Sequence, residues 1–131
     1  MSQDRIPSFD KFWPFYVREH SKKETRVAHF IGTTAFMTLL GTAIVKGKPW
    51  LIPLSIVSGY GPAWYSHFFI EKNRPATFKY PVWSLLADFR MWGKMVSGTM
   101  DAEVERVMRE EAESSEPAQA ETNGVMHEAV N

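Results

Sequence analysis

Two long stretches without a charged side chain dominate the hydrophobic pattern of this sequence. Residues 27–45 and 49–70 contain no Lys, Arg, Asp or Glu, and only Lys46-Gly47-Lys48 separates them. A helix needs about 20 apolar residues to cross the hydrocarbon core of a bilayer. The pattern therefore predicts two membrane-spanning helices joined by a tight turn. A soluble helical hairpin is the alternative that the pattern leaves open.

The second apolar stretch carries helix-breaking residues at its middle, Gly59-Tyr60-Gly61-Pro62. Proline lacks the backbone N–H that a helix interior uses, and glycine loosens the neighbouring turn. We therefore expect the second helix to be broken at Gly59–Pro62, with a simple proline kink as the alternative. Unwound backbone at membrane depth is covered by protein or lines a wet cavity, and such breaks often mark binding sites.

Amphipathic segments flank the two apolar stretches. Before them, one helical face carries aromatic and aliphatic residues, namely Phe9, Phe12, Trp13, Tyr16 and Val17. After them, residues 82–100 place apolar side chains on one face and Asp88, Arg90 and Lys94 elsewhere. Helices of this kind lie in the headgroup region of a membrane, and the three charges make a third span the less favoured interpretation. The predicted fold class is all-α: a membrane helical hairpin flanked by amphipathic interfacial helices.

The polar ends of the chain suggest its division. We expect a short leader over residues 1–7, a single helical membrane domain over residues 8–113 and a disordered tail over residues 114–131, where apolar residues are few. Basic residues gather on the terminal side of the hairpin (Arg18, Lys22, Lys23, Arg26, Lys72, Arg74 and Lys79), whereas the turn has only two. By the positive-inside rule, this multi-pass arrangement places both termini in the cytoplasm. The sequence does not identify the organelle.

The composition excludes several classes of function. The 15 basic and 15 acidic residues cancel, so no overall positive field favours nucleic acid as a partner. The absence of cysteine excludes disulfides and thiolate chemistry. No glycine-rich phosphate loop, nucleophile elbow or His-Glu-x-x-His helix is present. Small residues along the first apolar stretch permit close helix packing, which leaves a homo-oligomer open.

Three histidines, His20, His29 and His67, lie in or beside the apolar stretches. Ionisable side chains near the membrane interior are costly and usually functional, and neutral imidazole is a common metal ligand. In the predicted hairpin all three fall at the terminal end, so we expect them to converge at one membrane depth. Three imidazoles without thiolate suit Fe, Zn, Cu or Ni. Hydrogen-bonded interfacial histidines are the alternative. A fourth histidine, His127, belongs to the predicted tail, where we expect no chemical role.

Charged residues at the same end are further candidates for the site. Glu71 follows His67 by one helical turn, so it could bind the metal, orient an imidazole or form a salt bridge. Arg26 and Arg74 could hold the carboxylate of an acyl chain, or serve only to attract lipid headgroups. Membrane lipid is the predicted partner in either case.

Ordered motifs in this sequence resemble a known family. They are Phe15-Tyr16-x-x-x-His20, Thr25-x-x-x-His29-x-x-Gly32-Thr33, His67-Phe68-Phe69-x-Glu71-Lys72-Asn73-Arg74-Pro75-Ala76-Thr77 and Asp88-Phe89-Arg90-Met91. Over residues 9–100 the chain is similar to small multi-pass membrane proteins whose characterised fungal member is an iron(II)-dependent 2-hydroxy fatty acid dioxygenase of the endoplasmic reticulum. It departs from the fungal pattern at Ser21, Thr25 and Ser66, where that pattern has His, Asn and Gly.

The resemblance implies an activity and roles for the candidate residues. Fe(II) held by His20, His29 and His67 would oxidise a 2-hydroxy fatty acid with O2 to the acid one carbon shorter, the chemistry of fatty acid α-oxidation. Glu71 would orient an imidazole or bind the metal, and Arg26 or Arg74 would hold the substrate carboxylate. The alternative is a non-catalytic membrane protein that binds lipid or a partner and keeps its histidines for structure.

Overall fold

The computed structural model describes residues 5–130, and every regular element within that range is a helix. In chain order the elements are α1 (Phe9–Glu19), α2 (Lys23–Lys46), α3 (Leu51–Ser66), η2 (His67–Glu71), η3 (Ala76–Phe78), α4 (Pro81–Val96) and α5 (Met100–Val130). The predicted all-α fold class is confirmed. The predicted leader lies partly outside the described residues, since residues 1–4 do not belong to them.

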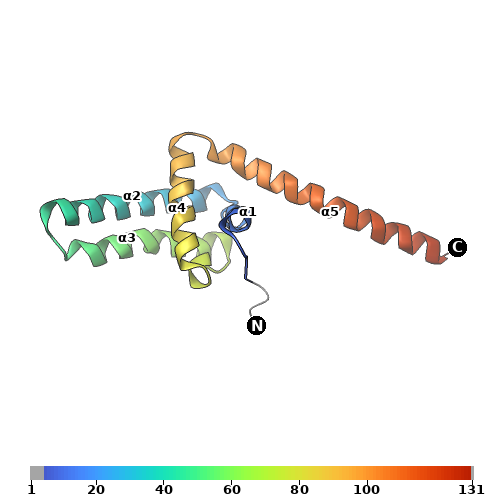
Figure 1. Cartoon of the computed structure of the whole chain (residues 1–131), viewed down its shortest axis with the longest axis horizontal. Coiled ribbons are helices and arrows are strands. Elements are labelled where there is room, and N and C mark those ends of the chain that lie inside the picture. The colour runs from blue at the N-terminus through green and yellow to red at the C-terminus, as the bar shows by residue number, and fades with distance from the viewer. Residues whose placement is uncertain (1–4, 131) are drawn as a thin grey trace.

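Helices α2 and α3 form the predicted antiparallel hairpin (Figure 1). Gly47 ends α2 in the left-handed conformation, with a φ of 61°, which glycine adopts without strain. Farther along the hairpin, a Cβ added to Gly32 would lie only 2.6 Å from the carbonyl oxygen of Gly59. Glycine at both positions lets the two backbones approach this closely. The glycine pair therefore sets the separation of the helices near the open end of the hairpin.

The prediction that the second helix breaks at Gly59–Pro62 is wrong. Helix α3 continues through these residues with Pro62 inside it. Gly59 serves the close approach of α2 rather than an unwound turn, and packing along a partner helix overrides a poor local propensity. The irregular turn comes later, at η2, which is a π-helix. Single π turns inside helical segments occur frequently at functional sites.

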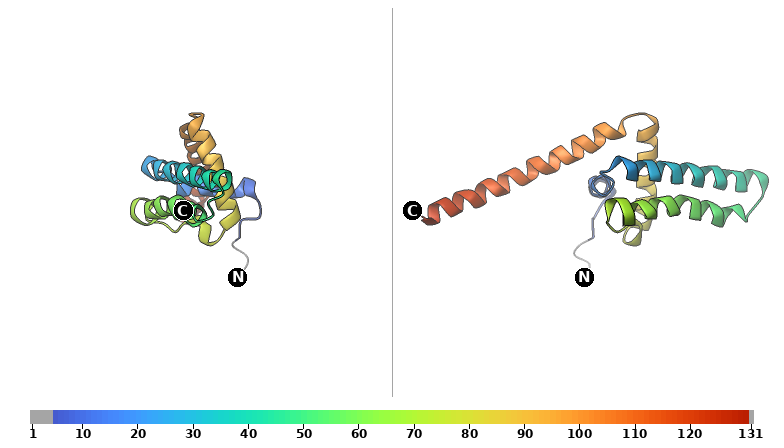
Figure 2. Two further views of the ribbon diagram at one scale, coloured as in Figure 1. Left: turned by 90° about the vertical axis from the view of Figure 1, so that its left-hand side faces the viewer. Right: turned by 180° about the vertical axis from the view of Figure 1, so that it is seen from behind.

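Helix α4 crosses the hairpin, and α1 lies at the open end where α2 begins and η2 ends (Figures 1 and 2). An aromatic and aliphatic core joins α1 to α4; its fully buried members include Phe12, Trp13, Tyr16, Val17, Ala87 and Met91. The ring centroid of Phe12 lies 5.2 Å from that of Tyr80 and 5.7 Å from that of Trp83. Because His20 follows α1 directly, this core fixes its position at the open end of the hairpin.

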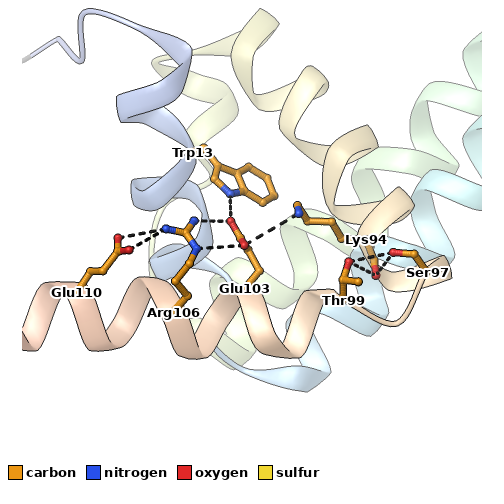
Figure 3. Close-up of polar contacts among 7 residues, drawn as sticks. All are labelled: Trp13, Lys94, Ser97, Thr99, Glu103, Arg106 and Glu110. Carbon is orange, nitrogen blue, oxygen red and sulfur yellow. Dashed lines mark hydrogen bonds and ion pairs between the residues drawn. The ribbon is translucent and has the colours of Figure 1, made fainter.

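A polar network ties the start of α5 to α1 and α4 (Figure 3). The indole N–H of Trp13 donates to the Glu103 carboxylate over 2.7 Å, and the same carboxylate lies 2.6 Å from Arg106 and 4.0 Å from Lys94. The hydrogen bond from Arg106, with that from Trp13, holds the pKa of Glu103 at about 2. Glu103 is therefore ionised at neutral pH and anchors α5 on the helix that leads to His20.

Glu111, farther along α5, lies 3.8 Å from Arg18 of α1. From there α5 extends away from the other helices and continues to Val130 (Figure 2). The division into a leader, a domain over residues 8–113 and a disordered tail over residues 114–131 stays a prediction. The side chain of His127 lies outside the part of the chain whose side chains the structure describes.

One helix in the described part of the chain, α2, is long and apolar enough to cross a membrane. Helix α3 is shorter, although η2 continues it without interruption. Large apolar side chains on the hairpin face outward; they include Ile31, Ile44, Val45, Trp50 and Val57. These features favour membrane association by length, composition and exposure alone. The multi-pass topology and the cytoplasmic termini stay predictions.

Candidate metal centre

The three predicted histidines meet at the open end of the hairpin. His20 is the C-terminal cap of α1, His29 lies in the second turn of α2, and His67 is the first residue of η2. All three side chains are buried. One ring nitrogen from each histidine lies within 4.8 Å of a ring nitrogen of each of the other two. The Nε2 atoms of His20 and His29 are 3.0 Å apart. The predicted meeting of the three histidines is confirmed, and the common membrane depth stays a prediction.

Backbone carbonyl groups select the tautomer of two of these histidines. The Nδ1 atom of His20 lies 2.6 Å from the carbonyl oxygen of Tyr16, and that of His29 lies 2.9 Å from the carbonyl oxygen of Thr25. A carbonyl oxygen can only accept, so each Nδ1 carries the ring proton. In a neutral imidazole the Nε2 atom is then left with a free lone pair, and it is this atom that faces the other ring.

Asn73 selects the same tautomer in His67. Its amide oxygen lies 2.7 Å from Nδ1 of His67, while its amide nitrogen donates to the Glu19 backbone carbonyl over 3.2 Å and to the Glu19 carboxylate. Both Glu19 atoms are acceptors, so the amide can only be oriented with its oxygen toward the imidazole. Lys72, with a φ of 58°, reverses the chain so that the Asn73 N–H donates to the His67 carbonyl over 2.9 Å. This turn places the amide beside the ring.

Three buried imidazole nitrogens without protons thus converge on one point, an arrangement that favours a cation. Burial, followed by the neighbouring His29 and His67, holds the pKa of His20 well below its ordinary value, so this ring is neutral at pH 7. Two nitrogens bound to one ion at about 2.1 Å are at most about 4.2 Å apart. The separation of 3.0 Å lies within that limit, and the 4.8 Å bound on the set requires only a small closure. The donor set fits a transition metal, and it does not choose among Fe, Zn, Cu and Ni.

Tyr16 links this centre to α4. Its ring stacks on that of His20, with centroids 3.9 Å apart and planes inclined by 24°. Its hydroxyl donates to the carboxyl group of Asp88. Burial raises the pKa of Asp88 to about 7, and the hydrogen bond from Tyr16 opposes this rise. The sequence pattern places Tyr16 on the same helical face as His20, which is the only signal that relates it to the site.

Comparison with known proteins establishes the family. A family model described as 2-hydroxy-palmitic acid dioxygenase Mpo1-like matches residues 6–100. This chain belongs to that family. The region that matches the Mpo1-like model contains all three histidines as well as Asn73 and Asp88, and it ends where α5 begins. Neither a search of curated proteins nor a search of solved structures found a match.

Two of the predicted charged residues hold the turn that carries His20. The Arg26 guanidinium is buried and donates to the carbonyl oxygens of His20 over 2.9 Å and Ser21 over 2.7 Å. The Glu71 carboxylate accepts from the backbone N–H of Lys22 over 2.7 Å, and it is not one of the ligand atoms grouped around the histidines. These contacts are structural. Direct roles for Arg26 and Glu71 toward substrate or metal stay predictions.

Arg74, the third predicted charged residue, lies in different surroundings. It is exposed and lies in the segment between η2 and η3. It directly follows Asn73, the residue that contacts His67. Its predicted role toward a carboxylate stays a prediction.

The positions that depart from the fungal pattern lie around the same centre. The Ser21 and Thr25 carbonyl groups accept the bonds described above, which any residue could provide from its backbone. Ser66 donates its hydroxyl to the Ala63 carbonyl over 2.6 Å and lies 3.4 Å from Nδ1 of His29. The Thr25 hydroxyl oxygen is buried without a hydrogen-bond partner. The departures therefore leave the three imidazoles and their tautomers unchanged.

Proposed function

We propose that this protein is an Fe(II)-dependent membrane dioxygenase that shortens 2-hydroxy fatty acids by one carbon. One 2-hydroxy acid and one O2 give one acid shorter by one carbon, one CO2 and one water, so the reaction balances without a reducing cosubstrate. The family description supports the substrate class. The observation that carries the proposal is the convergence of three buried Nε2 atoms whose protons are held on the opposite ring nitrogen.

In this proposal His20, His29 and His67 hold the iron, which supplies Lewis-acid and O2 chemistry when bound. The ring protons stay on Nδ1, away from the metal, because each Nδ1 donates to the carbonyl group of Tyr16, the carbonyl group of Thr25 or the amide oxygen of Asn73. Hydrogen-bond partners of this kind orient ligating histidines and increase their basicity. Burial of the three rings excludes bulk water from their inner faces. The protein thus supplies three neutral imidazoles that are held in orientation and shielded from bulk water.

Arg74 binds the substrate carboxylate in this proposal. A guanidinium presents two parallel N–H groups that match a carboxylate. Arg74 is exposed, whereas Arg26 already donates to two backbone carbonyls and acts as a positioning residue for His20. Glu71 positions the start of α2 through the Lys22 N–H and thereby orients the same imidazole indirectly.

The hairpin spans the membrane twice in this proposal, with both termini in the cytoplasm. The outward-facing apolar residues of α2 and α3 contact lipid, and the basic residues at the open end lie at the cytoplasmic surface. The site then lies at the depth where a fatty acid places its carboxyl group, so the substrate reaches it from the bilayer.

Metal analysis and oxygen uptake test the proposal together. Protein purified in detergent should contain about one iron per chain after loading with Fe(II), and His67→Ala should lose it. Wild-type protein should consume O2 with 2-hydroxypalmitate and release the 15-carbon acid, while His29→Ala should not. Two results together would favour the non-catalytic lipid-binding alternative: His67→Ala keeps the metal content of the wild type, and the wild type consumes no more O2 than the His29→Ala control.

A further inference from the structure

A cavity of about 380 Å³ lies between α2, α3 and α4. Its wall is mainly apolar, with Phe36, Leu40, Ile52, Ile56, Leu85 and Phe89 among the lining residues. This volume is within the range of about 300–1,000 Å³ that is typical of small-molecule sites. The hydroxyl of Ser55, which also lines it, donates to the Ile52 carbonyl of its own helix over 2.6 Å, so it is satisfied there without a ligand.

One end of the cavity borders the histidine centre. Thr33 lines the cavity and lies one helical turn beyond His29 on the same face of α2. Asp88 also lines it and accepts the hydrogen bond of Tyr16, whose ring stacks on His20. The metal centre and the cavity are therefore neighbours that share the α2 wall and the Tyr16–Asp88 contact.

The cavity extends from that end toward the turn of the hairpin. On α2 the lining residues run from Thr33 to Leu40, which is seven residues and a rise of about 10 Å along the helix. Ile52, in the first turn of α3, lines the same far end. The lining residues thus follow both helices of the hairpin, and the carboxyl group of Asp88 lies toward the histidine end. A straight alkyl chain whose polar group lies at the histidines matches this distribution.

We propose that this cavity binds the alkyl chain of a free fatty acid, with the carboxyl end toward His29 and with Ile56 and Leu40 limiting the length of chain that fits. The identity of the polar end rests on the proposed function; the alkyl site itself rests on the cavity. On α3 Ile56 lies midway between the lining residues Ile52 and Tyr60 and is 46% exposed. A larger side chain there therefore obstructs the part near Ile52 and leaves the part near Thr33 open.

Photolabelling tests the location of the chain without requiring turnover. The probe is a palmitic acid with a diazirine in the middle of its chain, applied to full-length protein in phospholipid nanodiscs. Labels should concentrate on residues 33–40 and 52–60, and free 2-hydroxypalmitate should compete with them. The proposal would be overturned if the labels were spread over the whole outer face of α2 and α3. It would also be overturned if added phospholipid competed with the probe as strongly as the free acid does.

A matched pair of variants tests the length limit. Ile56→Trp narrows the cavity, whereas Val57→Trp adds the same bulk at a neighbouring residue that is 67% exposed and does not line the cavity. Ile56→Trp should weaken competition by 2-hydroxypalmitate by about tenfold or more, while competition by 2-hydroxydecanoate changes by less than about twofold. Val57→Trp should leave both unchanged. Ile56→Ala, which enlarges the space, provides a second variant and should favour longer chains.

The outcomes separate this proposal from the proposed function. Competed labelling at the cavity with no oxygen uptake would refute the enzyme and retain the alkyl site. Oxygen uptake whose chain-length preference is the same in wild type, Ile56→Trp and Val57→Trp would refute the alkyl site and retain the enzyme.

Discussion

The hydrogen bond between Asn73 and His67 should control metal affinity. Replacing Asn73 by Ala removes the acceptor that lies 2.7 Å from Nδ1 of His67 and also the two bonds to Glu19. The imidazole can then place its proton on Nε2, the atom that must bind the metal, and its ring is no longer held in orientation. Loss of such a partner typically weakens metal binding by about 10–100-fold, or about 1.4–2.7 kcal/mol.

The assay is a competition titration of Fe(II) or Co(II) against a chromophoric chelator. Asn73→Ala should bind the metal about 10–100-fold more weakly than wild type. The neighbouring Arg74→Ala is the matched control: it should bind metal as wild type does and lose affinity only for the 2-hydroxy acid. Equal metal affinity in wild type and Asn73→Ala, with His67→Ala binding none, would refute the tautomer argument. Circular dichroism should show the same helix content in all variants.

Three further substitutions test the packing and electrostatics of the fold. Gly32→Ala should destabilise the protein by about 1–3 kcal/mol in thermal unfolding because its Cβ meets the α3 backbone, whereas Gly41→Ala, which meets nothing within 4 Å, should not. Burial raises the pKa of Asp88 from 3.8 to about 7, so the folded state favours the protonated carboxyl group. The free energy of unfolding that this group contributes is fully present below about pH 4 and is lost as the pH rises through 7. The loss is at most about 4 kcal/mol. Asp88→Asn should flatten this dependence in unfolding curves measured from pH 4 to 8; an unchanged slope would show that another group titrates. Trp13→Phe removes the hydrogen bond between α1 and α5 and should cost about 1 kcal/mol in chemical unfolding, and no change would mean that the bond adds nothing to stability.

The sequence was sufficient to predict the meeting of the three histidines. The spacing of charged residues determines the lengths of the two apolar helices, and an antiparallel hairpin necessarily brings the start of one beside the end of the other. His29 and His67 therefore share one end, and His20 precedes α2 by too few residues to lie elsewhere. The meeting of the three histidines therefore follows from the order and length of the helices alone, without knowledge of side-chain packing.

The failed and missing predictions depend on contacts across the fold. The local pattern around Gly59 predicts a broken helix, but the role of Gly59 depends on Gly32 of the facing helix, which no local pattern reveals. The bond between Tyr16 and Asp88 depends on the direction in which α4 crosses the hairpin. The role of Asn73 depends on the left-handed residue before it, since lysine is not a residue type that predicts a positive φ.

The π turn at η2 makes chain length itself part of the histidine centre. This segment holds more residues per turn than an α-helix, which has 3.6 residues per turn, or about 100° of rotation for each residue. Deleting a single residue between His67 and Lys72 would shorten the span over which the N–H groups of Lys72 and Asn73 both reach back to the His67 carbonyl. A return to ordinary helical winding would keep the direction of the helix but lose this turn, so the amide of Asn73 would lose its place beside the imidazole although every side chain in the centre remained. Among family members, the number of residues in this interval should therefore vary less than their identity.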